Sequence, residues 1–252
     1  MGGDGLETFP ASAAVTSTLP PIADNCLLAA LPISDRRRIL RSCEIVELAL
    51  AELIYSPWQR LDSIYFPTSS FISLTMPTGD SPTFEVGLVG NEGMLGTAIA
   101  LNADMSPERA TVRGAGSALR MDATALRCEL RRGGALRGEI DRYVHVRMGQ
   151  LAQAAICAQF HLLEARVAYR MLTIQDRART NSFNLTQDGL AQKLGARRAG
   201  VTQAASSLKQ RRLIRYNRGH VTVLDRRGLM SVACSCYKAD RDSNDRIRSV
   251  SH

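Results

Sequence analysis

The stretch of sequence that decides the fold runs from Leu185 to Arg215 and reads L-T-Q-D-G-L-A-Q-K-L-G-A-R-R-A-G-V-T-Q-A-A-S-S-L-K-Q-R-R-L-I-R. Thr186 is a residue type that caps helices, and Asp188 follows in the first turn, where the helix dipole favours an acid. Gly195 can end this helix in a tight turn. Beyond it, apolar residues recur at helical spacing: Val201, Ala204, Ala205 and Leu208. Two short helices joined by a glycine turn predict a helix-turn-helix.

The second helix of this pair carries polar and basic residues on its outward face: Arg197, Arg198, Thr202, Gln203 and Lys209. Two short β-prone runs follow at 213–217 and 220–224, around the turn dipeptide Arg218-Gly219. This pattern indicates a hairpin, which would form a wing beside the helix-turn-helix. A helix with such side chains is suited to the major groove of DNA.

The charge of the chain is concentrated in this motif. Residues 184–231 contain ten Lys and Arg against two Asp, a surplus of +8, which equals the net charge of the 252-residue chain. A basic surplus confined to one motif is typical of proteins that bind a phosphate backbone. An ordinary helical pair in a core would not require it. We therefore predict double-stranded DNA as the partner.

The remaining composition excludes several classes. No stretch approaches about 18 consecutive apolar residues, so we expect no membrane-spanning helix and no membrane partner. Residues 1–22 lack the basic start and apolar core of a signal peptide, and we expect them to form a disordered tail. Six cysteines without a secretory signal favour reduced thiols and a cytoplasmic location.

The segment 23–134 reads as an antiparallel β-roll. After a helical stretch near 25–41, seven short β-prone runs are separated by Pro and Gly turn signals; they span 43–49, 53–55, 63–66, 70–76, 84–89, 110–114 and 118–121. The interior of such a roll can hold a small ligand. We therefore predict a sensor domain here, within an α+β chain.

A long helix is predicted over 135–162. It has one apolar stripe at helical period: Leu136, Ile140, Val144, Met148, Leu151, Ala155, Ala158 and Leu162. The stripe fits either packing on the chain's own roll or a two-stranded coiled coil between subunits. Because a helix-turn-helix usually works as a dimer, we expect a homodimer. The DNA-binding domain then occupies 163–237, and the polar segment 238–252 is expected to fray.

The order β-roll, long helix and winged helix-turn-helix resembles the Crp/Fnr family of bacterial transcription regulators, from about residue 25 to residue 237. Besides the Leu185–Ile214 motif, the matching segments are Ile64-Tyr-Phe-Pro67 with Phe71-Ile-Ser-Leu74, Glu85-Val-Gly-Leu-Val-Gly-Asn-Glu-Gly-Met-Leu-Gly96, and Arg215-Tyr-Asn-Arg-Gly-His220. The resemblance implies a cyclic-nucleotide-binding-domain-like jelly roll at the N-terminus. It also implies a dimer on an inverted-repeat site, with RNA polymerase as a partner and a small molecule as a possible effector.

The resemblance also places the effector and base contacts. In cyclic-nucleotide-binding members, a Gly-Glu pair holds the ribose and an Arg-Ser pair holds the cyclic phosphate. The resemblance places Glu92 and Arg109 of this chain at the Glu and Arg positions. Here Asn91 separates Gly90 from Glu92, and Ala110 stands where Ser is expected, so the alternative is a structural role in the roll. Losing one charge-assisted donor would cost about 1.5–3 kcal/mol, and we expect no regulation by cyclic AMP. The DNA contacts implied by the motif are Thr186, Arg197, Arg198, Ala199, Thr202, Gln203, Lys209 and Arg218.

Four further residues suggest a second chemistry. Cys157 and His161 are i, i+4 on one helix, and Cys234 and Cys236 form a Cys-x-Cys pair past the wing. If the C-terminal segment folds back, they form a zinc or redox site, which would make the regulator metal- or redox-responsive. The alternative is a set of incidental buried thiols. The sequence identifies no cofactor.

Two other functions compete with a DNA-binding regulator. An enzyme built on the roll is disfavoured because no His precedes His145, which removes imidazole ligands and bases from the roll. We therefore predict that the protein is not an enzyme. A purely architectural basic protein would not require a well-patterned β-roll.

Overall fold

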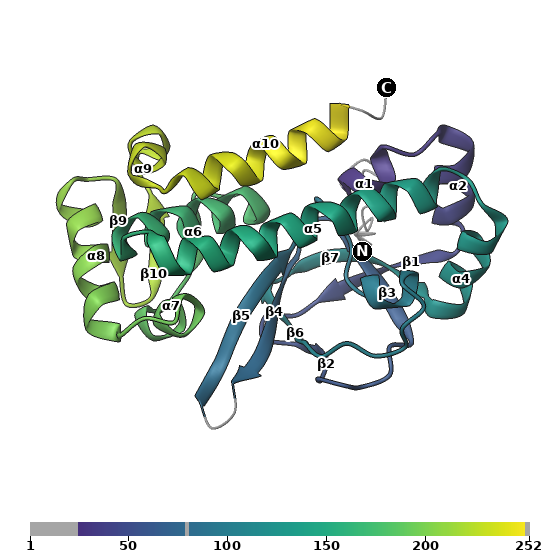
Figure 1. The fold of residues 1–252 in the computed structure, drawn as a ribbon, viewed down its shortest axis with the longest axis horizontal. Helices are drawn as coiled ribbons and strands as arrows, with labels where there is room; N and C mark the ends of the chain where they lie inside the picture. Colours follow the sequence, from purple (N-terminus) through teal and green to yellow (C-terminus); the bar gives the residue numbers. More distant parts are fainter. Residues whose placement is uncertain (1–24, 79–80, 250–252) are drawn as a thin grey trace, which may run out of the picture.

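The computed structural model describes residues 25–78 and 81–249, and it has a β-roll joined through a long helix to a smaller helical domain (Figure 1). The predicted tail at 1–22 lies outside the described residues. Two antiparallel sheets form the roll. One has the order β1-β7-β3, and the other has the order β2-β6-β4-β5. The strands are β1 (Cys43–Leu48), β2 (Leu53–Tyr55), β3 (Ser63–Pro67), β4 (Phe71–Thr78), β5 (Ser81–Val89), β6 (Arg109–Gly114) and β7 (Gly116–Asp122). All seven predicted runs form strands.

The core of the roll lies between the two sheets and under short helices. Ile64, Phe66, Ile72 and Val112 are fully buried, because alternate residues of these strands point inward. The covering helices are α1 (Cys26–Ala29), α2 (Ile33–Leu40), α3 (Thr97–Ala100) and α4 (Ala123–Arg132). Helix α4, which was not predicted, begins where the Asp122 carboxylate accepts a hydrogen bond from the Thr124 backbone amide at 2.6 Å.

The long helix α5 (Ala135–Phe160) has two halves with different surroundings. Its first half packs on the roll, where Leu136 and Ile140 are buried. In its second half, Met148 is 64% exposed and Leu151 is 46% exposed. The apolar stripe predicted for this helix is therefore divided: only its N-terminal part covers the chain's own core.

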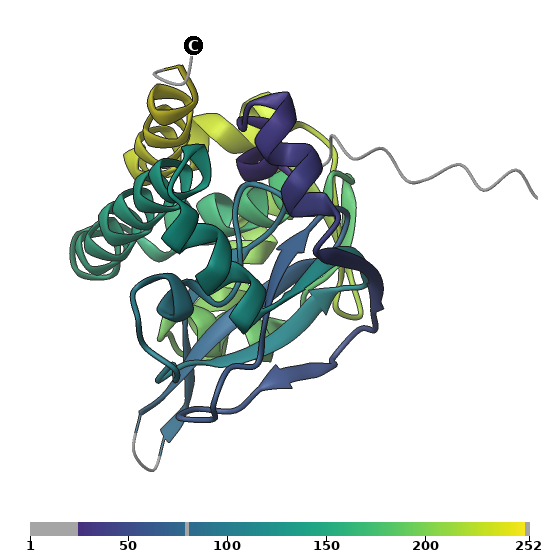
Figure 2. The ribbon, with the colours of Figure 1, turned by 90° about the vertical axis from the view of Figure 1, so that its right-hand side faces the viewer.

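The C-terminal domain has a core of its own around Val167, Met171, Leu190, Val201 and Leu208. Figure 2 shows the molecule from the side, with the strands of the roll below the purple helices α1 and α2. The domain contains α6 (Leu163–Ala178), β8 (Ser182–Asn184), α7 (Gln187–Leu194), α8 (Arg198–Gln210), β9 (Ile214–Asn217), β10 (His220–Val223) and α9 (Arg226–Val232). Its three strands form a small sheet in the order β8-β10-β9.

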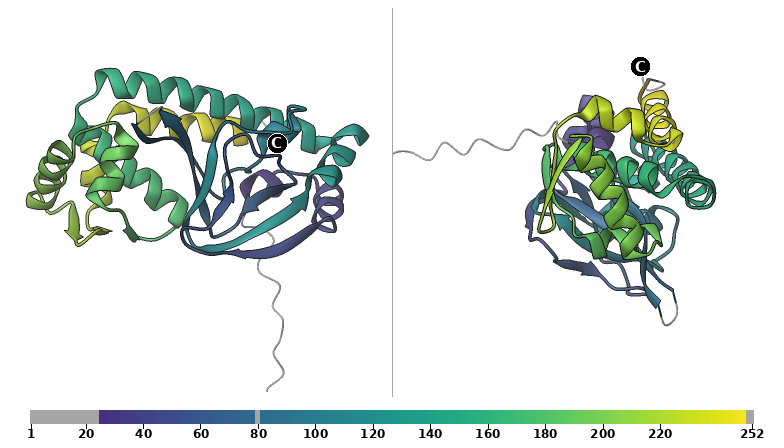
Figure 3. Two further views of the ribbon diagram at one scale, coloured as in Figure 1. Left: turned by 90° about the horizontal axis from the view of Figure 1, so that it is seen from below. Right: turned by 90° about the vertical axis from the view of Figure 1, so that its left-hand side faces the viewer.

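The chain beyond Tyr237, predicted to fray, instead continues helix α10 (Ser235–Ser249). This helix runs alongside α5, as Figure 3 shows. Tertiary contacts hold it: the Tyr237 hydroxyl donates to Asp176 at 2.9 Å, and Tyr169 donates to Asp240. A polar sequence alone gave no sign of these partners. Within the described residues, no helix is long and apolar enough to cross a bilayer.

Candidate nucleic-acid interface

The helix-turn-helix is built by local signals in its own sequence. The Thr186 hydroxyl caps α7 by accepting a hydrogen bond from the Gly189 amide at 3.1 Å. Gly195 ends the helix in the left-handed region, with φ of 58°, a conformation that glycine adopts at little cost. Helix α8 then packs Val201 and Leu208 inward, and both are fully buried. Its opposite face is left to the solvent.

The wing closes beside the start of α7. Arg218 and Gly219 have φ of 46° and 80°, which is the backbone of a two-residue hairpin turn between β9 and β10. The Tyr216 hydroxyl donates to the Leu185 carbonyl, and His220 Nδ1 lies 3.0 Å from Asn184 Oδ1. These contacts fix the wing against the segment that leads into the helix-turn-helix.

A cleft of about 400 Å³ lies between the N-terminus of α7, the outward face of α8 and the wing. It brings together four of the sequence-predicted residues: Thr186, Arg198, Lys209 and Arg218. Ser206 and Tyr216 also line it and were missed. Ser206 lies four residues after Thr202 on the same helix, and residues at this spacing share one helix face. The helical period could therefore have indicated Ser206 from the sequence.

The other predicted contacts do not line this cleft. Arg197, Ala199 and Gln203 are exposed at the start of α8 and along it. The Thr202 hydroxyl lies 2.8 Å from Gln187 Oε1 and 3.0 Å from the Arg198 carbonyl oxygen. Thr202 is therefore already engaged within the domain.

Arg198 has one neighbouring carboxylate. Its Nε lies 3.1 Å from Asp188 Oδ1, with the two side chains 68% and 63% exposed. A guanidinium carries five N–H donors, so this contact leaves the terminal nitrogens for a second acceptor. Among the described residues, no carboxylate forms an ion pair with Arg197, Lys209 or Arg218. We call these three residues and Arg198 the outer cations.

A different set of basic side chains faces the β-roll. Glu85 of β5 is buried, and its carboxylate pairs with Arg170 of α6 and with Lys193 of α7, whose Nζ lies 3.0 Å away. Ser73 also donates to this carboxylate. Burial lowers the pKa of Lys193, and the charge of Arg170 adds to that effect. Glu85 therefore forms ion pairs with two buried basic side chains at the junction of the two domains.

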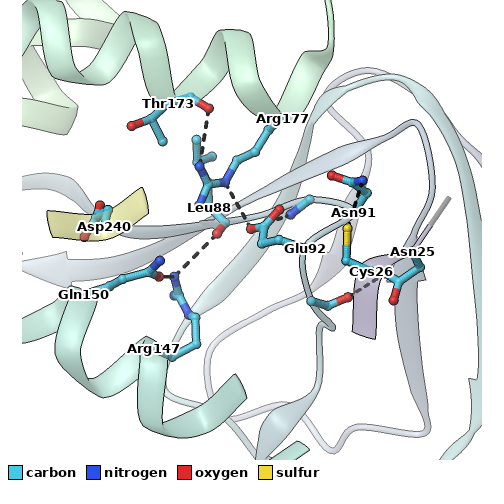
Figure 4. Close-up of polar contacts among 12 residues, drawn as sticks. Asn25, Cys26, Leu88, Asn91, Glu92, Arg147, Gln150, Thr173, Arg177 and Asp240 are labelled. Carbon is cyan, nitrogen blue, oxygen red and sulfur yellow. Dashed lines mark hydrogen bonds and ion pairs between the residues drawn. The ribbon is translucent and has the colours of Figure 1, made fainter. Parts of the chain in front are cut away.

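Glu92, an effector-binding candidate, lies at the same junction (Figure 4). Its Oε1 accepts from the Gly90 amide at 3.1 Å and from Arg177 Nε of α6 at 3.1 Å. Both side chains are largely buried. Arg109, the second candidate, is exposed at the start of β6. We call Arg170, Arg177 and Lys193 the inner cations.

The structure also gathers the four Cys and His residues singled out in the sequence. The ligand atoms of Cys157, His161, Cys234 and Cys236 all lie within 4.8 Å of one another. The three cysteines are buried, and His161 is partly buried. The proximity arises because the chain between α9 and α10 passes the end of α5, and α10 then runs back alongside that helix.

Comparison with known proteins identifies the helix-turn-helix domain and the overall fold. The family model of the Crp-like helix-turn-helix domain matches residues 165–232. A search of curated protein sequences found no match. Among solved structures, FixK2 from Bradyrhizobium japonicum superposes with a TM-score of 0.65 at 12% identity, covering 76% of this chain and 98% of FixK2.

Two further structures superpose in the same way. A CRP/FNR-family transcriptional regulator from Thermus thermophilus has a TM-score of 0.62 at 18% identity, covering 75% of this chain and 98% of its own. A putative regulator of this family from Eubacterium rectale has a TM-score of 0.64 at 13% identity, covering 82% and 96%. The chain therefore has the fold of the Crp/Fnr transcription regulators, with a Crp-like helix-turn-helix domain at residues 165–232.

Proposed function

We propose that this protein is a dimeric transcription regulator that reads an inverted-repeat DNA site and receives its signal through the β-roll. The observation that carries the proposal is the cleft between α7, α8 and the wing. Arg198, Lys209 and Arg218 are exposed around it, beside the N-terminal amides of α7. Basic side chains next to the N-terminus of a helix suit the phosphates of a duplex.

The second half of α5 supports pairing with a second copy of this chain. Its exposed apolar residues recur at spacings of three and four, which is the pattern of a coiled-coil seam: Met148, Leu151, Ala155 and Ala158. Leu162, predicted as the last residue of the stripe, lies beyond the end of α5. Ala residues in such a seam allow two helices to approach closely. Pairing through it would place two α8 helices about one DNA turn apart, roughly 34 Å.

Light scattering with matched variants tests the dimer. Leu151→Glu should yield a monomer at micromolar concentration, because it places a charge in the seam. Leu101→Glu is the control, since Leu101 is 55% exposed on the roll and outside the seam. A wild-type monomer in the presence of target DNA would contradict the proposed dimer.

For base reading, we propose that Arg198 recognises a guanine in each half-site. A guanidinium can donate to O6 and N7 together, a pattern that no other base offers in the major groove. Ala199 cannot accept from cytosine, although its methyl group can contact a thymine methyl, and Gln203 can pair with adenine. Arg197 and Thr202 lie beside these positions, while Lys209, Arg218 and Thr186 would contact phosphates.

The signal is proposed not to be cyclic AMP. The Glu92 carboxylate is engaged by Arg177, and the side chain of Ala110 is buried. The cavity between the roll and α5, lined by Glu108, Tyr143 and other residues, has a volume of about 150 Å³. Ligand pockets usually measure about 300 Å³ or more. Calorimetry should detect no micromolar binding of cyclic AMP; such binding would restore Glu92 and Arg109 as effector ligands.

Selection of bound sequences from random duplex DNA tests the function directly. The purified protein should enrich an inverted repeat whose half-sites lie about 10 bp apart, centre to centre, with one required guanine in each. Enrichment of a single asymmetric site, or of none, would contradict the proposal.

We further propose that the protein acts in the cytoplasm with RNA polymerase as a partner and catalyses no reaction.

A further inference from the structure

The four residues Cys157, His161, Cys234 and Cys236 come from two separate parts of the fold. Cys157 lies in the last turn of α5, and His161 is the residue that ends this helix. Cys234 and Cys236 lie where α9 gives way to α10. The two pairs are thus separated by the whole helix-turn-helix and wing, and they meet only in the folded chain.

The geometry of this cluster matches a tetrahedral metal centre. Cys157 Sγ lies 3.6 Å from Cys234 Sγ, and Cys236 Sγ lies 3.2 Å from His161 Nδ1. With Zn–S bonds of about 2.3 Å, tetrahedral coordination separates two sulfurs by roughly 3.8 Å. Small adjustments of side chains would therefore bring all four ligand atoms to one ion.

The surroundings also suit a metal with thiolate ligands. Cys236 is fully buried, and Cys157 and Cys234 are nearly so. Gln153 Nε2 lies 3.0 Å from Cys236 Sγ, where its N–H can donate to a thiolate. Hydrogen bonds of this kind orient metal ligands from outside the coordination sphere. A set of incidental core thiols would not require a converging imidazole and an amide donor.

We propose that Cys157, His161, Cys234 and Cys236 bind one Zn²⁺ ion. Three thiols lose their protons on binding, and neutral His161 supplies the fourth ligand through Nδ1. Cys₃His is a common ligand set of closed structural zinc sites. All four positions are taken by protein ligands, so the ion holds structure and activates no water.

The ion would join the two sides of a hinge. Helix α5 ends at Phe160, and His161 and Leu162 have extended backbone, with ψ of 142° and 143°, before α6 begins. Two ligands precede Leu162, and the other two follow α9. The zinc therefore fixes the C-terminal domain relative to α5. Its effect on DNA affinity rests on the proposed function, because α5 is the proposed dimer helix.

Metal analysis of the full-length protein tests the site without reference to DNA. Protein purified under reducing conditions should contain about one zinc per chain, and Co²⁺ in its place should give the visible and thiolate charge-transfer bands of a tetrahedral thiolate site. Cys234→Ser/Cys236→Ser should lose the metal and both bands. Cys43→Ser and Cys128→Ser are the controls, since these thiols lie outside the cluster. Both control variants should keep the metal and both cobalt bands.

Three results would overturn the proposal. One is wild-type protein that takes up neither Zn²⁺ nor Co²⁺ after complete reduction. Another is a Cys157–Cys234 disulfide that persists when the protein is isolated with zinc. The third is stoichiometric iron and sulfide in place of zinc. Because wild-type cobalt spectra need no variant, misfolding of the double variant would not leave the site untested.

The consequence for DNA is measured separately. Removing zinc with a chelator should weaken binding to the selected DNA site, and restoring Zn²⁺ should recover it. If zinc binds but does not change the DNA affinity, the metal site is supported and its proposed role at the hinge is rejected. No DNA binding by the zinc-loaded protein would instead reject the proposed function.

Discussion

The C-terminal domain carries basic side chains on two faces, and their surroundings are opposite. The outer cations Arg197, Arg198, Lys209 and Arg218 are exposed, and only Arg198 has a carboxylate partner among the described residues. The inner cations Arg170, Arg177 and Lys193 are largely screened from solvent and are paired with carboxylates from the roll. The same residue types therefore have two kinds of surroundings. The buried carboxylates of the roll join the inner cations to it. The outer cations, which have no buried carboxylate partner among the described residues, are the ones that we propose bind DNA.

The largest expected effect on stability comes from removing a carboxylate that pairs with the inner cations. Glu85→Gln leaves Arg170 and Lys193 buried without a carboxylate, and removing one partner of a buried ion pair costs about 3–5 kcal/mol. We expect a lower free energy of unfolding, or release of the C-terminal domain from β5, in chemical denaturation. Glu44→Gln is the control, because Glu44 is exposed in its pair with Arg120 and should cost about 0–1 kcal/mol. Equal effects of the two substitutions would mean that the buried Glu85 carboxylate contributes no more to stability than an exposed one.

A smaller effect is expected from the outer face. Arg198→Ala should cost about 1–3 kcal/mol of binding free energy per half-site on the selected DNA, and relax the preference at one guanine. Binding curves on the selected site and on guanine-substituted sites measure both quantities. The folded stability should change little, since the Arg198–Asp188 pair is exposed. An equal loss on every sequence would mean that Arg198 contacts phosphate and reads no base.

Features that depend on contacts between residues close in the sequence could be predicted, and features that depend on contacts between distant residues could not. The cap at Thr186, the turn at Gly195 and the hairpin at Arg218-Gly219 are local, so the helix-turn-helix and wing were predicted and are confirmed. The seven strands followed from turn signals between short apolar runs and are also confirmed.

The inner face and α10 depend on contacts between distant residues. Glu92 and Arg177 are 85 positions apart, and no local pattern distinguishes Arg170 or Lys193 from surface charges. The polar segment after Tyr237 looked unstructured, because its anchors lie on α5 and α6. The proximity of the Cys and His residues was anticipated only on the condition that the C-terminus folds back, which the structure shows it does.

The salt dependence of DNA binding compares the two faces most directly. Removing one cation that neutralises a phosphate should reduce the slope of log K against log salt by about 0.9. We therefore expect Lys209→Ala and Arg218→Ala each to flatten the slope by about that amount, with a similar loss of affinity on all sequences. Lys193→Met, on the same helix-turn-helix but facing Glu85, should leave the slope unchanged. An unchanged slope for the outer variants, or an equal flattening for Lys193→Met, would contradict the division of the domain into a DNA face and a roll face.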